Sequence, residues 1–268
     1  MCPIHIIIRV KVIMENQMID LHTHILPGID DGARCVDDSL ILLREQNQQG
    51  VNSVVFTPHF RSDKKAYEDF IEDRINSLNL LIESKEFKSM NMSIKVGAEV
   101  YFSVNLANMQ LDALCFSGTR YILIELPVNF MPSGLTYTLN DILNKGYVPI
   151  IAHVERYPYI VKNPLILYDL VDRGCLAQVN AATLLNKGDA YSMALKFIKW
   201  GLAQFLCSDC HSMKGRPPNL KDGLSIVKKR LGKQYSECLI YNAENVFKDK
   251  TLDSLSIEKP KKILGSWH

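Results

Sequence analysis

Residues 19–24 read Ile-Asp-Leu-His-Thr-His, and the rest of the chain is organised around them. An apolar run ends in this stretch, and two imidazoles follow at positions i and i+2. At the end of a β-strand, this spacing directs both side chains to one face. Two neutral imidazoles on one face supply half of a metal site, so His22 and His24 are candidate ligands.

Strand-like runs alternate with helix-like stretches along the chain. Strands are predicted at 19–21, 51–56, 94–96, 121–124, 148–152, 175–179 and 202–207. Helices are predicted at 37–49, 67–84, 133–144, 164–173, 189–200 and 219–231. The alternation is typical of repeated βα units, and the nearly continuous apolar strands indicate a parallel sheet buried on both faces.

Composition limits the class of protein. The 268 residues are 47% apolar, which fits one domain of α/β-barrel size or two smaller ones. With 31 basic and 29 acidic residues intermixed, the chain gives no sign of a nucleic-acid-binding surface. No apolar stretch reaches the length that a membrane span needs, so we expect no membrane insertion. Seven scattered cysteines indicate reduced thiols in a cytoplasmic protein.

Potential ligands collect at the predicted strand ends, where a parallel barrel carries its chemistry. The histidines at these ends are His22, His24, His59, His153 and His211. The carboxylates in similar places are Asp31, Glu99, Glu125 and Asp209. This set exceeds the needs of one ion and predicts two or three ions that share carboxylates. Mixed nitrogen and oxygen donors suit Mn, Fe, Zn or Co better than an all-oxygen site would.

Two arginines are expected at the same face. Arg156 follows His153 by three residues, and Arg216 follows His211 by five. A guanidinium fork on loops above the strand ends suits a phosphate group.

Two other motifs favour ordinary explanations. Cys207 and Cys210 have the C-x-x-C spacing of a redox pair or half a zinc site, but no second such pair exists and Cys207 falls in an apolar strand. No cysteine is followed by the phosphate-cradling loop of a cysteine phosphatase. The basic run at 228–230 is interpreted as a solvated helix face, with docking of an acidic or phosphotyrosine-rich partner as the alternative.

Several motifs together resemble one family. They are D-L-H-T-H, P-G-I-D-D-G, T-P-H-F, G-A-E-V, E-L-P, A-H-V-E-R-Y and S-D-x-H, and they span about residues 18–247. The set resembles the polymerase-and-histidinol-phosphatase (PHP) superfamily, and more closely the metal-dependent tyrosine phosphatases of bacterial capsule and exopolysaccharide loci, the CpsB/YwqE type. The resemblance implies a distorted seven-stranded (β/α) TIM-like barrel as a single domain, with a trinuclear centre that usually holds manganese; Fe, Zn, Co or Mg would be the other candidates.

The resemblance also implies a ligand assignment. His22, His24, Glu99 and Asp209 would hold one ion. Glu99 would bridge to a second ion held also by Glu125 and His153. Asp31, His59 and His211 would hold the third. Asp31 is preferred over Asp30 because of its spacing from His24, and Arg156 and Arg216 match the phosphate-binding, catalytic arginines of the family.

Three functions follow as alternatives. The first is a protein-tyrosine phosphatase in which a metal-bridging hydroxide attacks phosphotyrosine, with the tail of a bacterial tyrosine kinase as the expected substrate. The second is a small-molecule phosphatase of the histidinol-phosphate type. The third is a binding module that keeps only the fold. The sequence leaves the general acid and the oligomeric state open.

The domain boundaries complete the predictions. Residues 1–17 are expected to be an N-terminal extension, either an edge strand or a poorly folding segment, and Met18 would itself be a plausible start. Residues 18–247 are predicted to be the phosphatase domain. Residues 248–268 are predicted to be a polar, loosely held tail.

Overall fold

The computed structural model describes residues 17–252, 256–263 and 265–268. The prediction for the N-terminal extension therefore lies, apart from Gln17, outside the described residues. Within these ranges no helix is long and apolar enough to cross a membrane.

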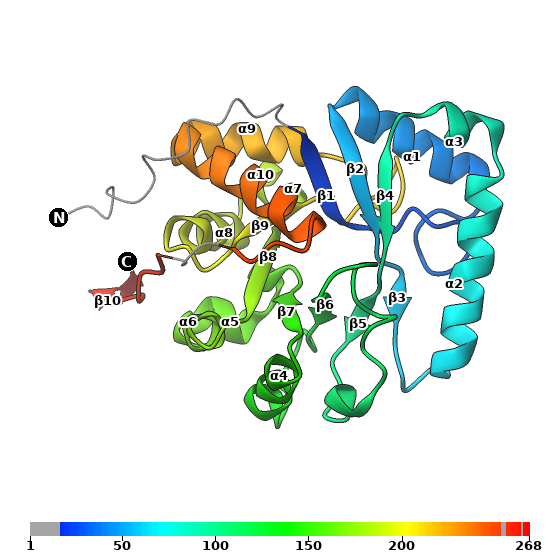
Figure 1. Cartoon of the computed structure of the whole chain (residues 1–268). Coiled ribbons are helices and arrows are strands. Elements are labelled where there is room, and N and C mark those ends of the chain that lie inside the picture. The colour runs from blue at the N-terminus through cyan, green and yellow to red at the C-terminus, as the bar shows by residue number, and fades with distance from the viewer. Residues whose placement is uncertain (1–16, 253–255, 264) are drawn as a thin grey trace.

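In the described part of the chain, nine parallel strands form two sheets that make up the barrel (Figure 1). The smaller sheet has the order β1-β2-β4, with β1 at Met18–Thr23, β2 at Val51–Phe56 and β4 at Ser93–Val96. The larger sheet has the order β3-β5-β6-β7-β8-β9. Its strands are β3 (His59–Phe60), β5 (Glu99–Tyr101), β6 (Tyr121–Glu125), β7 (Val148–Ile151), β8 (Leu176–Asn180) and β9 (Phe205–Cys207).

The two sheets together form one barrel wall, in which two of the strand positions are interrupted. Strand β2 continues into β3 after Thr57-Pro58, and β4 continues into β5 after Gly97-Ala98. Proline has no N–H to donate, which favours a break in the ladder at Pro58. Two backbone hydrogen bonds span the break, from Gly97 N to Phe56 O at 2.8 Å and from Glu99 N to Pro58 O at 3.0 Å.

Strand β1 closes the wall against the segment that follows β9. Asp209 N donates to His22 O at 3.0 Å, and His24 N donates to Cys210 O at 2.9 Å. With the interrupted strands counted once each, seven strand positions surround one interior. The predicted single-domain, distorted (β/α)7 barrel is therefore confirmed.

Ten α-helices cover the described part of the barrel. They are α1 (Val36–Gln48), α2 (Tyr67–Ile82), α3 (Lys85–Ser89), α4 (Leu135–Asn144), α5 (Pro158–Lys162), α6 (Leu165–Asp172), α7 (Ala181–Leu185), α8 (Asp189–Lys199), α9 (Leu220–Arg230) and α10 (Lys233–Phe247). Short 3-10 helices lie at η2 (Leu106–Asn108) and η3 (Val154–Arg156). All six predicted helices are present, with ends that differ by no more than two residues.

Helix α10 was not predicted from the sequence. It packs beside α9 and β1 (Figure 1), and its Ala243 and Val246 join a buried cluster with Ile19 of β1. Just beyond it, the carbonyl of Lys250 accepts a hydrogen bond of 2.7 Å from the hydroxyl of Tyr121, the first residue of β6. Helix α10 therefore covers the amino ends of the strands and leaves the carboxyl ends free.

The described part of the C-terminal segment contains regular structure. Its strands β10 (Lys262–Ile263) and β11 (Ser266–Trp267) form a hairpin. The indole of Trp267 donates to Lys162 O at 3.1 Å, and its carbonyl accepts from Lys196 Nζ at 2.8 Å. These contacts fix the described part of the tail to α5 and α8.

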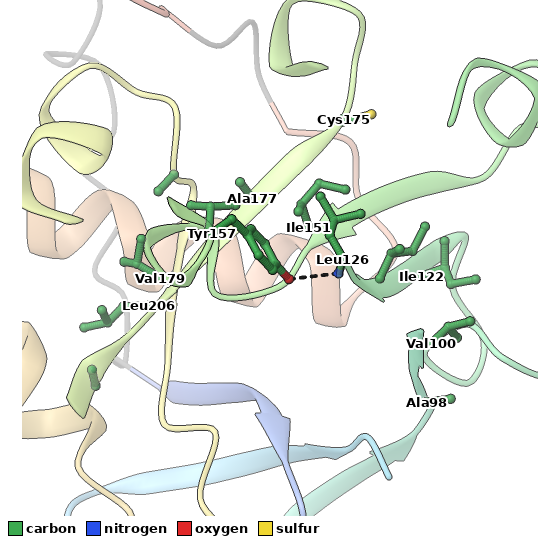
Figure 2. Close-up of a cluster of buried hydrophobic side chains, with 14 of the residues drawn as sticks. Ala98, Val100, Ile122, Leu126, Ile151, Tyr157, Cys175, Ala177, Val179 and Leu206 are labelled. Carbon is green, nitrogen blue, oxygen red and sulfur yellow. Dashed lines mark hydrogen bonds between the residues drawn. The ribbon is translucent and has the colours of Figure 1, made fainter. Parts of the chain in front are cut away.

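Strand side chains alternate between two buried clusters. Ile122 and Ile151 pack outward toward the helices, whereas Leu123 and Ile150 belong to a second cluster. Figure 2 shows the outward cluster around Tyr157, whose hydroxyl oxygen accepts a 2.9 Å hydrogen bond from the N–H of Leu126. This bond ties the loop after β6 to the loop after β7, and both loops lead to the site described next.

Candidate metal centre

Four donor atoms from three strand ends converge on one point. Nε2 of His22 and Nε2 of His24 lie 3.1 Å apart. Each lies 3.3 Å from Glu99 Oε2 and 3.4–3.5 Å from Asp209 Oδ1. Donors around a tetrahedral ion with bonds of roughly 2.1 Å are separated by about 3.4 Å. The cluster therefore has the spacing of a single-ion site, made of the four residues predicted for the first ion.

A second group surrounds Glu125 at the end of β6. Donor atoms of His59, Glu99 and Glu125 lie within 4.8 Å of one another. Nε2 of His153 lies 2.9 Å from Glu99 Oε1 and 3.8 Å from Glu125 Oε1. The structure thus places His153 beside the two carboxylates predicted to share an ion with it, and it adds His59 to the group.

A third group includes the exposed carboxylate of Asp31. Its Oδ1 lies 3.4 Å from His59 Nε2 and 3.3 Å from His211 Nε2, and His24 completes the group. His59 faces Asp31 through Nε2 and Glu99 through Nδ1, the latter at 2.9 Å. It therefore lies between the second and third groups.

Asp30 has a different position from Asp31. Its Oδ2 lies 2.7 Å from His24 Nδ1 and accepts from His59 N at 3.0 Å, and its Oδ1 accepts from Gly32 N at 2.9 Å. A Cβ on Gly32 would lie 2.0 Å from His24 O, so only glycine allows the loop to return this close. Asp30 orients the His24 ring from the nitrogen opposite the donor cluster, which leaves Asp31 as the carboxylate among the donors.

Amide side chains support the ligands that follow β7 and β9. Gln178 Oε1 accepts from His153 N at 2.8 Å, and Gln178 Nε2 donates to Asn180 Oδ1 at 2.5 Å. Asn180 Nδ2 then donates to Asp209 Oδ2 at 2.8 Å. Neither amide was among the predicted site residues. Gln178 lies inside an apolar run, and only its alternation with Asn180 on one face of β8 could have identified it.

Backbone strain occurs at two of the candidate ligands. His153 has φ +33° and Asp209 has φ +52°. Among described residues other than glycine, only Asp249 shares a positive φ. A left-handed backbone costs about 1–2 kcal/mol in an L-residue, and such strain tends to lie at functional sites.

The buried charges depend on one another. Burial alone would raise the pKa of Glu99, but His22 and its other histidine neighbours hold it well below the usual range. Burial is likewise outweighed at Asp209, where His22 and His24 lower the pKa to about 2. At Glu125, burial and the neighbouring Glu99 raise the pKa.

Three buried atoms of the candidate ligands have no hydrogen-bond partner. They are Glu99 Oε2, His153 Nδ1 and His211 Nε2. Unpartnered polar atoms are rare in protein interiors. Burial also lowers the pKa of His211 to about 3, which keeps its imidazole neutral and able to bind an ion. The residues present therefore fit a cluster of divalent ions.

Both predicted arginines lie at the rim. Arg156 Nη1 and Arg216 Nη1 are each 3.3 Å from Asp209 Oδ2, and Arg216 Nη2 is 3.1 Å from Asp31 Oδ2. Their side chains are 42% and 39% exposed. They therefore reach both the donor cluster and solvent, where an incoming anion would meet them.

Neither of the two other sequence motifs supplies a donor atom to the three groups, although Cys210 lies between Asp209 and His211 in the sequence. Among the described residues all six cysteines are free, and Cys207 and Cys210 are buried. The basic residues 228–230 are exposed at the end of α9, consistent with a solvated helix face.

A parallel barrel with histidines and carboxylates at the carboxyl ends of its strands and arginines at its rim defines a metal-binding barrel hydrolase. The family described as capsular polysaccharide synthesis, CpsB/CapC, matches residues 18–248, and this chain belongs to it. The resemblance inferred from the sequence is confirmed.

Its relatives are tyrosine phosphatases by name. The chain is 34% identical to the putative tyrosine-protein phosphatase CapC of Staphylococcus aureus over 76% of its own length and 81% of that protein. It is 31% identical to the tyrosine-protein phosphatase YwqE of Bacillus subtilis over 88% of its length and 93% of the relative.

Comparison with solved structures also finds a tyrosine phosphatase of this family. The chain superposes on a structure from a study of YwqE of B. subtilis and CpsB of Streptococcus pneumoniae, described as unique metal-dependent tyrosine phosphatases, with a TM-score of 0.82 and 28% identity, covering 91% of this chain and 100% of that one. A phosphotriesterase from Mycobacterium tuberculosis matches with a TM-score of 0.54 and 12% identity over 87% of this chain and 94% of that one, which concerns the fold alone.

Proposed function

We propose that this protein is a metal-dependent protein-tyrosine phosphatase. The observation that carries the proposal is the convergence of nine nitrogen and oxygen ligands and two arginines at one mouth, in a member of a family whose named relatives are tyrosine phosphatases. The ligands are His22, His24, Asp31, His59, Glu99, Glu125, His153, Asp209 and His211. The arginines are Arg156 and Arg216.

Three sites account for the donors. The first ion would be held by His22, His24, Glu99 and Asp209. The second would be held by Glu99, Glu125 and His153, and His59 lies near enough to take part. The third would be held by Asp31, His59 and His211. Imidazole and carboxylate together suit manganese, and the same set accommodates Fe, Zn or Co.

Bound divalent ions supply Lewis acidity, which lowers the pKa of water and offsets the charge of a phosphoryl group. Arg156 and Arg216 bind the phosphate oxygens and orient them toward the donors, since a guanidinium fork matches phosphate geometry. Asp30 fixes the ring of His24, and the Gln178–Asn180 pair holds His153 and Asp209 in place. A tyrosyl oxygen, with a pKa of about 10, leaves more readily than an alkoxide does.

The substrate and setting extend the proposal. We assign the phosphatase to residues 18–247 and expect its substrate to be the phosphotyrosine tail of a bacterial tyrosine kinase that controls capsule or exopolysaccharide synthesis. The family description and the names of the relatives support this setting. The free thiols of the described cysteines support a cytoplasmic location.

The test is hydrolysis of a phosphotyrosine peptide by metal-stripped protein after manganese is added back. A serine-phosphorylated peptide and histidinol phosphate serve as comparison substrates. Manganese-dependent release from the tyrosine peptide alone is the expected result. Faster turnover of histidinol phosphate, expressed as kcat/KM, would instead assign the site to a small metabolite.

A further inference from the structure

Exposed large apolar side chains gather on two neighbouring loops at the mouth of the barrel. We call them the apolar rim: Val104, Val128, Phe130, Met131 and Tyr137. Val104 follows β5, whereas the other four lie between the end of β6 and the first turn of α4. Phe130 is 62% exposed, which leaves most of a large apolar side chain in water. Large apolar side chains that remain exposed in one region of a protein are typical of an interaction site.

The apolar rim follows the candidate metal centre closely along the chain. Val128 follows the candidate ligand Glu125 by three residues. Tyr159 Oη donates to Pro127 O at 2.9 Å, and Leu126 N donates to Tyr157 Oη at the same distance. Tyr157 comes directly after Arg156. These bonds therefore hold the start of the loop after β6 against the segment that carries Arg156.

The two loops of the apolar rim are also joined to each other. Val104 O accepts from Thr138 Oγ1 at 3.3 Å, and a Cβ on Gly134 would lie 3.4 Å from Val104 Cγ1. Buried Pro132 and Leu135 anchor the chain on either side of Gly134. The exposed side chains therefore rest on an anchored base.

Charge is distributed unevenly around the mouth. Residues 126–140 contain no charged side chain, whereas Arg156 and Arg216 are exposed cations beside the candidate ligands, and the guanidinium of Arg61 lies 3.9 Å from the ring centroid of Tyr101 at the end of β5. A phosphotyrosine segment has the matching division, with a dianionic phosphate and an apolar remainder. Because the phosphate must reach the carboxyl ends of the strands, the polypeptide that carries it must lie across this face.

We infer that the apolar rim binds the substrate polypeptide beside the phosphotyrosine and selects large apolar side chains at the flanking positions. The inference rests on the proposed function and adds the sequence preference of the substrate. Phe130 and Met131 are the principal contacts, because they are the two large apolar side chains at the end of four consecutive exposed residues, 128–131.

The experiment compares three substrates on two variants. Two phosphotyrosine peptides differ only in having leucine or serine on both sides of the phosphotyrosine, and p-nitrophenyl phosphate lacks any flanking residue. The test variant is the double substitution Phe130→Ala with Met131→Ala. The control is Leu80→Ala on α2, which removes an apolar side chain of similar exposure, 58%, outside the apolar rim.

The wild-type protein should prefer the leucine peptide by roughly tenfold in kcat/KM, mainly through KM, because about 1.4 kcal/mol of apolar burial corresponds to tenfold. The double variant should lose this preference and keep its activity on p-nitrophenyl phosphate. Leu80→Ala should behave as wild type. A double variant that retains the preference, or that loses activity equally on all three substrates, would overturn the inference.

Two further readouts separate this inference from the proposed function. If the wild-type protein hydrolyses no phosphotyrosine substrate, the proposed function fails. Binding of the fluorescein-labelled leucine peptide, measured by anisotropy, then tests whether the apolar rim binds the polypeptide. Equal Kd values for the wild type and the double variant would overturn the inference. Sedimentation velocity identifies the occupant. A wild-type dimer that the double variant dissociates would assign the surface to a second copy of the chain and overturn the inference.

Discussion

Asp30 Oδ2 lies 2.7 Å from Nδ1 of His24, while Nε2 of the same ring faces Glu99 and Asp209. A carboxylate on the outer nitrogen fixes the orientation of a ligating imidazole, and its removal typically weakens metal binding by about 10–100-fold. Asp30→Asn should therefore raise the Kd for manganese yet keep the full number of ions at saturation. Asp31→Asn should instead lower the bound metal by about one ion per chain.

Metal analysis after equilibrium dialysis checks both substitutions. The opposite ranking, with an ion lost from Asp30→Asn and none from Asp31→Asn, would place Asp30 among the ligands and Asp31 outside them.

Metal uptake should become tighter as pH rises. Burial alone would lower the pKa of His24, but Asp30 outweighs it and raises the pKa well above 6.5 in the metal-free protein; the pKa of His22 is raised as well. The raised pKa values favour the protonated rings, whereas ions bind only neutral imidazole, so metal binding must displace protons. Affinity should gain about tenfold per pH unit for each proton displaced, up to the raised pKa values.

The raised histidine pKa values also affect the stability of the metal-free protein, which should decrease as pH rises. A raised histidine pKa adds stability that is complete below 6.5 and disappears as pH rises through the folded-state value. Calorimetric titration with manganese in two buffers of different ionisation enthalpy measures the protons released. Identical heats in both buffers would contradict the prediction.

Arg156→Ala should lower phosphatase activity by orders of magnitude and leave the metal content intact. The guanidinium lies at the rim, 3.3 Å from Asp209, and is 42% exposed, so its loss removes a phosphate contact and no ion ligand. Arg173→Ala, an exposed arginine after α6, is the matched control for loss of one positive charge. Kinetics and metal analysis on the same samples provide the check, and full activity in Arg156→Ala would remove it from the mechanism.

Chelation should lower thermal stability as well as activity. Ions that bind only the folded chain stabilise it by about 4 kcal/mol at roughly 1,000 times Kd, which corresponds to a Tm change of roughly 10 °C for a domain of this size. Removal also leaves Glu99 and Asp209 close together without ions between them. Differential scanning calorimetry with EDTA, and with manganese restored, measures the change; an unaltered Tm would argue against a bound cluster.

Thiol reactivity should follow burial. Burial raises the pKa of Cys115 and of Cys175 to about 12, and it also raises the pKa of Cys210, whereas Cys35 is exposed. A thiolate is the reactive form, so buried thiols with raised pKa react slowly. At pH 8, Cys35→Ser should remove one fast-reacting thiol from an Ellman titration and Cys210→Ser should remove none. Fast reaction of Cys210 would revive a redox function for the C-x-x-C pair.

Most of the candidate ligands could be predicted because they follow apolar runs at strand ends, where a parallel barrel places its chemistry, whereas Asp31 lies in the loop after β1. Local pattern could not reveal the interruptions at Pro58 and Gly97, since the pairing of β3 with β5 depends on contacts distant in sequence. It also missed α10, whose buried positions include Ser236, Asn242 and Asn245 and so weaken the apolar stripe that marks a helix.

The different positions of Asp30 and Asp31 also could not be predicted from local sequence pattern. Adjacent carboxylates in one turn are equivalent to sequence reasoning except for their spacing from His24. The loop returns close to His24 at Gly32, where a side chain would collide with the His24 backbone. This return directs Asp30 toward Nδ1 of His24 and Asp31 toward the donor atoms of the third group.

The left-handed backbone at His153 and Asp209 has an evolutionary consequence. Glycine would adopt these conformations with less strain but would offer no donor atom, so selection for stability and selection for chemistry oppose each other at both positions. A descendant of this barrel that no longer processed phosphate would be released from that conflict and would be free to drift to glycine or asparagine. These two positions therefore offer a genomic criterion for separating working members of the family from barrels kept only as scaffolds.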